Sequence, residues 1–301
     1  RFRPGERVAV WAANTPEWQL IFYGCALAGI VMVTVNPAYK AGETEYVLEK
    51  SGAAGLFAMD SYRGYDAETA VASIRPRLPA LREVIRIADF EAFAASGAAG
   101  AALPDVAPEE ACVIMFTSGT TGRQKGVIFN HRGVINMANF TQARGGLARG
   151  GVFVNPMPMF HIGALGHAGV GAVMRQATHV LAREWSPDLY MSLVEREGGT
   201  FSLLVPTMIE AVLAHPDRAR YRLDTLRNLT SGASVVEAQL IRRTLAELNC
   251  TISNIYGQTE MQGSVTGVHP DDSEEDMATT IGQPLPHMEV VKDLVPDLTN
   301  F

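Results

Sequence analysis

The sequence contains only three cysteines in 301 residues, Cys25, Cys112 and Cys250. They lie far apart, their number is odd, and most of them have apolar neighbours. We therefore expect buried free thiols of a reducing compartment, namely the cytoplasm, and no disulfides. Their spacing matches no cysteine-based metal site.

The sequence also lacks an excess of positive charge. It has 25 basic and 32 acidic residues, a formal net charge of −7, and no long run of lysine or arginine. This composition makes nucleic acid an unfavourable partner, because neutralisation of phosphates dominates affinity for it. Hydrophobic residues make up 47% and charged residues 19% of the chain, which is typical of a globular protein with a sizeable core.

Charge is absent from Trp18 to Tyr39, a stretch that resembles a membrane span. Thr15 and Pro16 are typical of a helix start, however, and Gly29 of a helix end. The resulting helix of about 14 residues is shorter than the roughly 20 that a span requires. We therefore predict no transmembrane segment; peripheral contact with a membrane and the oligomeric state stay open. The N-terminus also lacks the apolar core of a signal peptide.

Apolar runs alternate with helical patterns along the first hundred residues. Strands are predicted at 7–11, 30–35 and 55–59, and helices from Pro16 and over 43–50, the second closed by Gly52. This alternation predicts an α/β fold with parallel sheets covered by helices in repeated βα units. Small residues at 92–102 indicate a surface linker. We expect a first α/β subdomain over 1–110 and a second over 111–301 that carries the functional site.

The same pattern continues in the second half. Ser234 and Glu237 have the spacing of a capping box, which predicts a helix from Ser234 to Leu248. Further helices are expected over 131–143 and from residues 187 and 206. Strands are expected at 112–116, 127–130, 200–205, 226–230, 252–255 and 288–291.

Residues 117–126, Thr-Ser-Gly-Thr-Thr-Gly-Arg-Gln-Lys-Gly, contain four hydroxyls, three glycines and one lysine. Glycines let backbone N–H groups approach an anion closely, hydroxyls donate to phosphate oxygens, and Lys125 adds positive charge. The segment differs from the common P-loop, because Gln124 precedes the lysine and Gly126 follows it. The alternative interpretation is a flexible polar turn.

This segment resembles the phosphate loop of the adenylate-forming (AMP-binding) superfamily, which includes fatty-acyl-CoA ligases, luciferases and the adenylation domains of peptide synthetases. That family usually has proline at the position of Gln124. Further segments resemble family motifs in the same order along the chain, and the resemblance extends over residues 5–292. They are Pro158-Met-Phe-His161, Ser231-Gly-Ala-Ser234, Tyr256-Gly-Gln-Thr-Glu260 and Gly282-Gln-Pro-Leu-Pro286.

The resemblance implies specific roles. ATP would be bound by Thr117, Ser118, Gly119, Thr120, Thr121, Gly122, Lys125, Gly232, Ala233, Ser234, Tyr256, Gly257, Gln258 and Thr259. Catalytic roles would belong to Lys125, His161, Thr259 and Glu260, and Mg²⁺ would be held by Glu260 with Thr117. Cations and N–H donors are needed because attack of a carboxylate on the α-phosphate brings two anions together. His167 carries no such support and is expected to be structural.

The acid substrate is expected to lack an amine. Amino-acid-activating relatives use an aspartate near the fourth motif, and residues 160–171 contain no acidic side chain. Glycines at 163, 166 and 169 leave room either for an apolar tail or for close helix packing, and both interpretations stay open. Residues 36–40 and 215–218 resemble segments of medium- and long-chain fatty-acyl-CoA ligases. The resemblance therefore implies a fatty acid, with coenzyme A as cosubstrate.

The family also has a ribose-binding aspartate, a hinge and a C-terminal domain with the adenylation lysine, none of which we find in 1–301. We therefore expect an N-terminal portion of a ligase, with weak activity or none. The alternatives are a non-catalytic protein that binds nucleotide or acyl groups, an adenylating enzyme for another carboxylic acid, and a luciferase-like oxidative enzyme.

Overall fold

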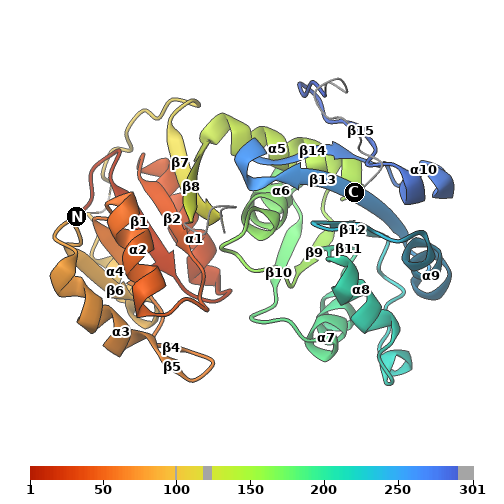
Figure 1. Ribbon diagram of the computed structural model, residues 1–301, viewed down its shortest axis with the longest axis horizontal. Coiled ribbons are helices and arrows are strands. Elements are labelled where there is room, and N and C mark those ends of the chain that lie inside the picture. The colour runs from red at the N-terminus through yellow and green to blue at the C-terminus, as the bar shows by residue number, and fades with distance from the viewer. Residues whose placement is uncertain (99, 118–123, 291–301) are drawn as a thin grey trace. The chain divides into compact units, whose positions relative to one another are not determined.

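The computed structural model describes residues 1–98, 100–117 and 124–290 (Figure 1). The chain divides into two compact units. Unit 1 comprises Arg1–Val134 and Pro158–Leu165, and unit 2 comprises Ile135–Met157 and Gly166–Phe301. Each unit contains a largely parallel sheet with helices, which confirms the predicted α/β fold.

Unit 1 is built on a sheet of six strands in the order β6-β3-β1-β2-β7-β8. The first five strands run parallel, and β8 pairs with β7 in the antiparallel sense. The strands are β1 (Arg7–Trp11), β2 (Val31–Val35), β3 (Gly55–Ala58), β6 (Glu83–Arg86), β7 (Ala111–Thr117) and β8 (Lys125–Asn130). The two-residue strands β4 (Ser61–Tyr62) and β5 (Tyr65–Asp66) form a separate hairpin. The helical elements are α1 (Pro16–Leu27), α2 (Ala41–Ser51), α3 (Ala67–Ile74) and α4 (Phe90–Ala95), with the 3₁₀ turns η1 (Arg75–Arg77) and η2 (Ile87–Asp89).

Local sequence explains the bounds of the first two helices. Thr15 Oγ1 accepts a hydrogen bond from the N–H of Trp18, 3.4 Å away, and Pro16 takes the first position of α1. Helix α2 ends at Gly52, whose left-handed backbone (φ +60°) favours glycine. Both helices therefore agree with the prediction. In the described part of the chain, every helix is too short or too polar to cross a membrane.

Unit 2 contains a sheet of seven strands in the order β10-β9-β11-β12-β13-β14-β15. The first five run parallel, whereas β14 and β15 add in the antiparallel sense. The strands are β9 (Val152–Asn155), β10 (Thr178–Leu181), β11 (Phe201–Leu203), β12 (Asn228–Gly232), β13 (Thr251–Gln258), β14 (Gly263–Gly267) and β15 (Gln283–Pro284). Helix α5 (His131–Gly145) and the π-helix η3 (Gly163–Val170) begin in unit 1 and continue into unit 2. The other helical elements of unit 2 are α6 (Gly171–Met174), α7 (Pro187–Glu197), α8 (Pro206–Leu213), η4 (Arg218–Arg220), α9 (Ala238–Leu248), η5 (Thr259–Met261) and α10 (Glu274–Thr279).

The core of unit 2 lies between its sheet and helices α7, α8 and α9. Apolar side chains from these elements, among them Met191, Ile209 and Ile241, are almost fully buried together. One polar pair is built into this core: the hydroxyl of Tyr190 donates to Ser202 Oγ, 3.0 Å away, and both residues are buried. Burial also raises the pKa of the Tyr190 phenol.

Four expectations from the sequence require correction. The boundary expected after residue 110 lies later, because β7 pairs in parallel with β2 and keeps the first unit together as far as Val134. The expected linker begins as helix α4. Helix α9 starts at Ala238, and its N-cap Glu237 makes no side-chain capping bond, so the capping box at Ser234 is wrong. Residues 288–290 form no strand, and residue 291 lies outside the described part.

The prediction that the cysteines are free and buried is confirmed. Cys25, Cys112 and Cys250 are all free and buried. Burial in apolar surroundings raises the pKa of each thiol to about 12. The thiols are therefore protonated and unreactive near neutral pH.

Candidate functional site

In unit 1, the phosphate-loop segment joins the ends of β7 and β8. Thr117 and Lys125 are paired residues of this antiparallel ladder, so the loop leaves and re-enters the sheet at adjacent positions. Thr117 is half-buried and Lys125 is exposed. The predicted site residues Ser118, Gly119, Thr120, Thr121 and Gly122 lie outside the described residues.

The return of the loop is held by two tyrosines from earlier in the chain. The hydroxyl of Tyr46 donates to the backbone oxygen of Gln124, and the side-chain amide of Gln124 donates to the hydroxyl oxygen of Tyr39. Both distances are 2.8 Å. Tyr39 follows the carboxyl end of β2, and β2 is the direct neighbour of β7 in the sheet.

The Pro158–His161 segment is tied to the carboxyl end of β1. Asn14 Oδ1 accepts a hydrogen bond from the N–H of Met159 at 2.7 Å, and both residues are buried. His161 Nδ1 accepts from the N–H of Gly163 at 3.1 Å. His161 keeps an exposed surface, yet protein atoms around the ring lower the pKa of its imidazole. The neutral ring that accepts this bond is therefore favoured.

In unit 2, two predicted motifs emerge side by side, because β12 and β13 are adjacent parallel strands. Gly232, at the end of β12, pairs with Ile255 of β13. A Cβ atom on Gly232 would lie 2.6 Å from the Ile255 carbonyl oxygen, so only glycine fits this crossing. Ser231 is fully buried, and its hydroxyl has no hydrogen-bond partner among the described residues. Such a group at a strand end indicates a place for a polar ligand.

The chain after Gly232 takes an unusual conformation. Ala233 has φ +68°, a value that residues other than glycine rarely adopt and that is common at binding sites. Ala233 and Ser234 are both exposed. The segment therefore continues as an irregular, accessible loop at the carboxyl edge of the sheet.

The Tyr256–Glu260 motif continues directly from the buried part of β13. Ile255 is buried, whereas Tyr256 is 40% exposed, so its ring is available for contact with a flat ligand. Gly257 and Gln258 complete the strand, and the Gln258 amide donates to the Tyr256 hydroxyl at 3.4 Å. Thr259 and Glu260 form the start of η5, where Glu260 is exposed.

The other polar features argue against alternative sites. In the described ranges, no group of three or more His, Cys, Asp or Glu side chains is placed to hold a metal ion. His167 is buried, and its Nε2 lies 3.1 Å from Ser264 Oγ, as a structural histidine would.

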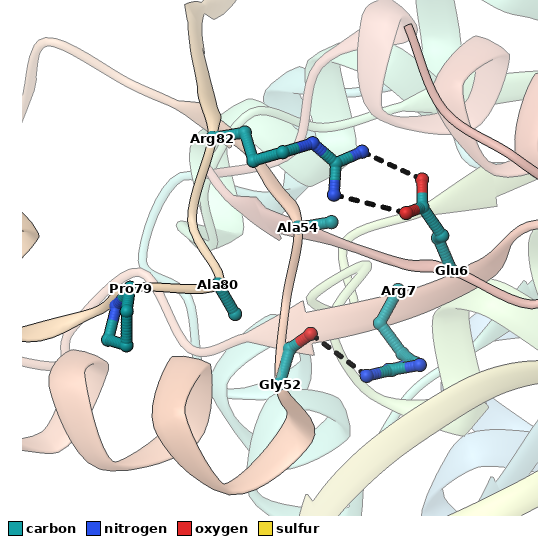
Figure 2. Close-up of a pocket in the computed structure, with 7 residues that line it drawn as sticks. All are labelled: Glu6, Arg7, Gly52, Ala54, Pro79, Ala80 and Arg82. Carbon is teal, nitrogen blue, oxygen red and sulfur yellow. Dashed lines mark hydrogen bonds and ion pairs between the residues drawn. The ribbon is translucent and has the colours of Figure 1, made fainter.

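A shallow pocket of about 250 Å³ lies in unit 1, as Figure 2 shows. It sits where β1, β3 and β6 begin, so it lies at the amino edge of the sheet rather than at the carboxyl edge. Arg82 makes two hydrogen bonds to Glu6, and Arg7 donates to the Gly52 oxygen that ends α2. The charged side chains that line this pocket therefore hydrogen-bond to other parts of unit 1 and stabilise its fold.

Sequence reasoning missed three of the residues that hold the motifs, namely Asn14, Tyr39 and Tyr46. A polar residue shortly after the buried strand β1 was the available signal for Asn14. Tyr39 lies in the Asn-Pro turn after β2, which gave a weak signal of the same kind. Tyr46 lies within a helix, where nothing in the local pattern separates it from a packing residue.

Comparison with known proteins gives matches along nearly the whole chain. The profile of the family described as AMP-binding enzyme matches residues 2–293. A methyl-dioxo-octahydroindenyl-propanoyl:CoA ligase of Mycobacterium tuberculosis is 34% identical over 301 residues, covering 95% of this chain and 59% of the relative. The mitochondrial medium-chain acyl-CoA ligase ACSF2 of Rattus norvegicus is 28% identical over 95% of this chain and 52% of its own length. The chain thus spans little more than half of these relatives.

Solved structures agree on the fold. The N-terminal domain of FACL13 from Mycobacterium tuberculosis matches with a TM-score of 0.85 at 24% identity, over 94% of this chain and 70% of that one. The anthranilate CoA ligase AuaEII in complex with anthranoyl-AMP matches with a TM-score of 0.86 at 23% identity, over 95% and 55%. At these identities the likeness concerns the fold alone.

Proposed function

Because the chain belongs to the AMP-binding enzyme family, we propose that it binds ATP and serves to activate a carboxylic acid as acyl-AMP. Residues 117–126 would contribute phosphate-binding groups, and the Ser231–Ser234 and Tyr256–Glu260 segments adenine-binding groups. The product acyl-AMP would pass its acyl group to coenzyme A in the complete enzyme. The three free, buried cysteines suit the reducing cytoplasm, which is the location we propose.

One observation carries this proposal most directly. The Ser231–Ser234 and Tyr256–Glu260 segments leave adjacent parallel strands at the same edge of one sheet. In open α/β sheets, ligands bind outside the carboxyl ends of the strands. The half-exposed ring of Tyr256 would stack on adenine, and the buried Ser231 hydroxyl would gain a polar partner.

Charged and hydroxyl groups in residues 117–126 and in the Tyr256–Glu260 segment suit a polyphosphate. The exposed ammonium of Lys125 and the hydroxyl of Thr117 lie at the two ends of the loop. Glu260 supplies one carboxylate, and a single carboxylate suits Mg²⁺, because this ion takes most of its ligands from phosphate oxygens and water. Thr117 and Glu260 would hold the ion, which neutralises charge on the phosphates when it is bound.

We propose a medium- or long-chain fatty acid as the substrate. Residues 162–172 are buried throughout and carry no acidic side chain. A substrate ammonium would have no counter-ion there, and burying it unpaired would be costly. The similarity to medium-chain acyl-CoA ligases supports the same substrate class.

Exchange of labelled pyrophosphate into ATP tests the function. We expect exchange that is slow, depends on a fatty acid and is not stimulated by amino acids. Exchange driven by amino acids alone would refute the substrate class.

Binding of nucleotide or acyl groups without turnover is the alternative that has to be distinguished from catalysis. Calorimetric titration with a non-hydrolysable acyl-AMP analogue, compared with the exchange assay, distinguishes binding from catalysis. Tight binding with no exchange would favour the alternative, and no binding at all would refute both.

A further inference from the structure

We propose that Tyr46 and Tyr39 are positioning residues for Lys125 and act through Gln124. The assignment rests on the proposed function, since it takes Lys125 as a phosphate-binding residue. Neither tyrosine would touch the reacting atoms. Their role would be to hold the backbone of Gln124, and thereby to fix the position of Lys125, the first residue of β8.

Tyr46 contacts both ends of the loop with one side chain. Its hydroxyl donates to the Gln124 backbone oxygen at 2.8 Å. Its ring lies edge-on to the ring of Phe116, with centroids 6.4 Å apart and planes at 76°. Phe116 is the last residue of β7 before Thr117, and Gln124 is the last before Lys125. One residue of helix α2 therefore contacts both Phe116 near the end of β7 and Gln124 directly before β8.

Tyr39 provides a second anchor, and its own position is well fixed. Asn36 Oδ1 accepts from the N–H of Ala38 at 2.9 Å, and the Asn36 backbone oxygen accepts from the N–H of Tyr39 at 3.0 Å. The same oxygen accepts from the buried Trp11 indole at 3.1 Å. This tight turn is tied to the sheet core. The hydrogen bond from Gln124 to Tyr39 consequently links the loop to a rigid part of unit 1.

Gln124 obtains its restraint from these two anchors. Proline would fix the backbone angle φ at this position, which glutamine does not. Here the side chain and the backbone oxygen of Gln124 each make one hydrogen bond to a tyrosine. The Gln124 Oε1 atom is buried and has no partner in the described part of the chain. An apolar side chain would fill the place at lower cost, so stability of the fold alone does not account for the amide.

The test uses calorimetric titration of the 301-residue chain with MgATP and, separately, with adenosine. Tyr46→Phe and Tyr39→Phe remove only the hydroxyls. We expect each to weaken MgATP about three- to tenfold, the equivalent of one net hydrogen bond, and to leave adenosine unchanged. Tyr62→Phe is the matched control, because Tyr62 lies in the β4–β5 hairpin, and it should bind MgATP as the unsubstituted chain does.

Gln124→Pro separates the two tyrosines. The substitution keeps the backbone oxygen that Tyr46 contacts and removes the amide that Tyr39 contacts. In this background Tyr39→Phe should have no effect, whereas Tyr46→Phe should still weaken MgATP. Equal effects of Tyr39→Phe in both backgrounds would show that Tyr39 does not act through Gln124.

The outcomes that overturn the assignment differ from those that overturn the function. MgATP affinity unchanged in both tyrosine variants would overturn the assignment alone. Equal losses for MgATP and adenosine would also overturn it, because they indicate a general structural effect. If the unsubstituted chain bound no MgATP, the proposed function would fail and the assignment with it.

Discussion

Replacement of Gly257 by alanine tests how the Tyr256–Glu260 segment is built. Gly257 lies where β13 crosses β14, next to a bulge in the ladder. An added Cβ would lie 2.0 Å from the Gly263 carbonyl oxygen and 2.6 Å from two further backbone atoms of Gly263 and Ser264. Because all three are backbone atoms, no side-chain rotation can relieve the overlap. The two strands must separate by more than about 1 Å, given ordinary contact distances.

The expected cost follows from this geometry. Overpacking of this kind costs about 1–3 kcal/mol. Separation also weakens the ladder bonds next to Gly257, each worth about 1 kcal/mol. We therefore expect Gly257→Ala to lower the free energy of unfolding of unit 2 by about 2–4 kcal/mol. Gly24 is the matched control, since it lies within α1 and has no atom within 4 Å of an added Cβ. Gly24→Ala should raise stability by about 0.5–1 kcal/mol.

Urea unfolding followed by circular dichroism gives the overall stability. Hydrogen exchange measured on peptides from β13 and β14 localises the change. We expect faster exchange in these two strands of Gly257→Ala and an unchanged rate in the strands of unit 1. If Gly257→Ala had the unfolding midpoint and exchange rates of the unsubstituted chain, the inferred close approach of β13 and β14 would be wrong.

Three further changes have defined outcomes. Burial lowers the pKa of His179 to about 4, below its unfolded value of about 6.5. The neutral ring of His179 should therefore contribute fully to the free energy of unfolding above pH 6.5. This contribution should be lost as the pH falls toward 4, at a cost of at most ~3 kcal/mol. His179→Asn should flatten that part of the pH profile of unfolding, and an unchanged profile would contradict the assignment. Tyr190→Phe leaves Ser202 Oγ buried without its donor and should cost about 1–3 kcal/mol in urea unfolding. The double variant with Ser202→Ala should lose less than the sum of the single losses; strict additivity would refute the coupling. Glu260→Gln should abolish most of the increase in ATP affinity that Mg²⁺ gives, with little change in Mg²⁺-free binding by calorimetry; retained Mg²⁺ dependence would refute its proposed role.

Much of the parallel sheet of unit 1 could be predicted from the sequence because its strands are buried on both faces. Such strands are continuous apolar runs, and β1 and β2 show this pattern almost without interruption. The caps at Thr15 and Gly52 are local signals, and they fixed the ends of α1 and α2 within two residues of the prediction. These features depend on short-range chemistry that the sequence displays directly.

Features that depend on tertiary context were not predictable in the same way. The composition at 92–102 suggested a surface linker, and a boundary was expected after residue 110. Strand β7 nevertheless belongs to the first sheet, because it pairs with β2. Ser234 and Glu237 have capping-box spacing, but Ser234 belongs to the exposed loop that follows β12. The strand expected at 252–255 extends to Gln258, because β14 pairs with the motif residues. In each case a distant segment of chain decides the local structure.

The candidate site shows the same division. The motifs themselves were visible in the sequence, and their described residues lie at strand ends where parallel α/β sheets bind ligands. The groups that hold them were not visible, because the contacts of Gln124 join residues 78 and 85 positions apart. No periodicity or spacing rule reports such a contact.

The distant contacts of Tyr39 and Tyr46 converge on one position, Gln124. A proline carries its restraint within its own ring, so it needs no partner. Glutamine must obtain the restraint from other residues, and Tyr39 and Tyr46 supply it through two 2.8 Å hydrogen bonds. The backbone position of residue 124 therefore depends on three residues, Gln124, Tyr39 and Tyr46, rather than on residue 124 alone. Substitution of Tyr39 should consequently matter only while glutamine occupies position 124, and this dependence distinguishes a positioning contact from ordinary packing.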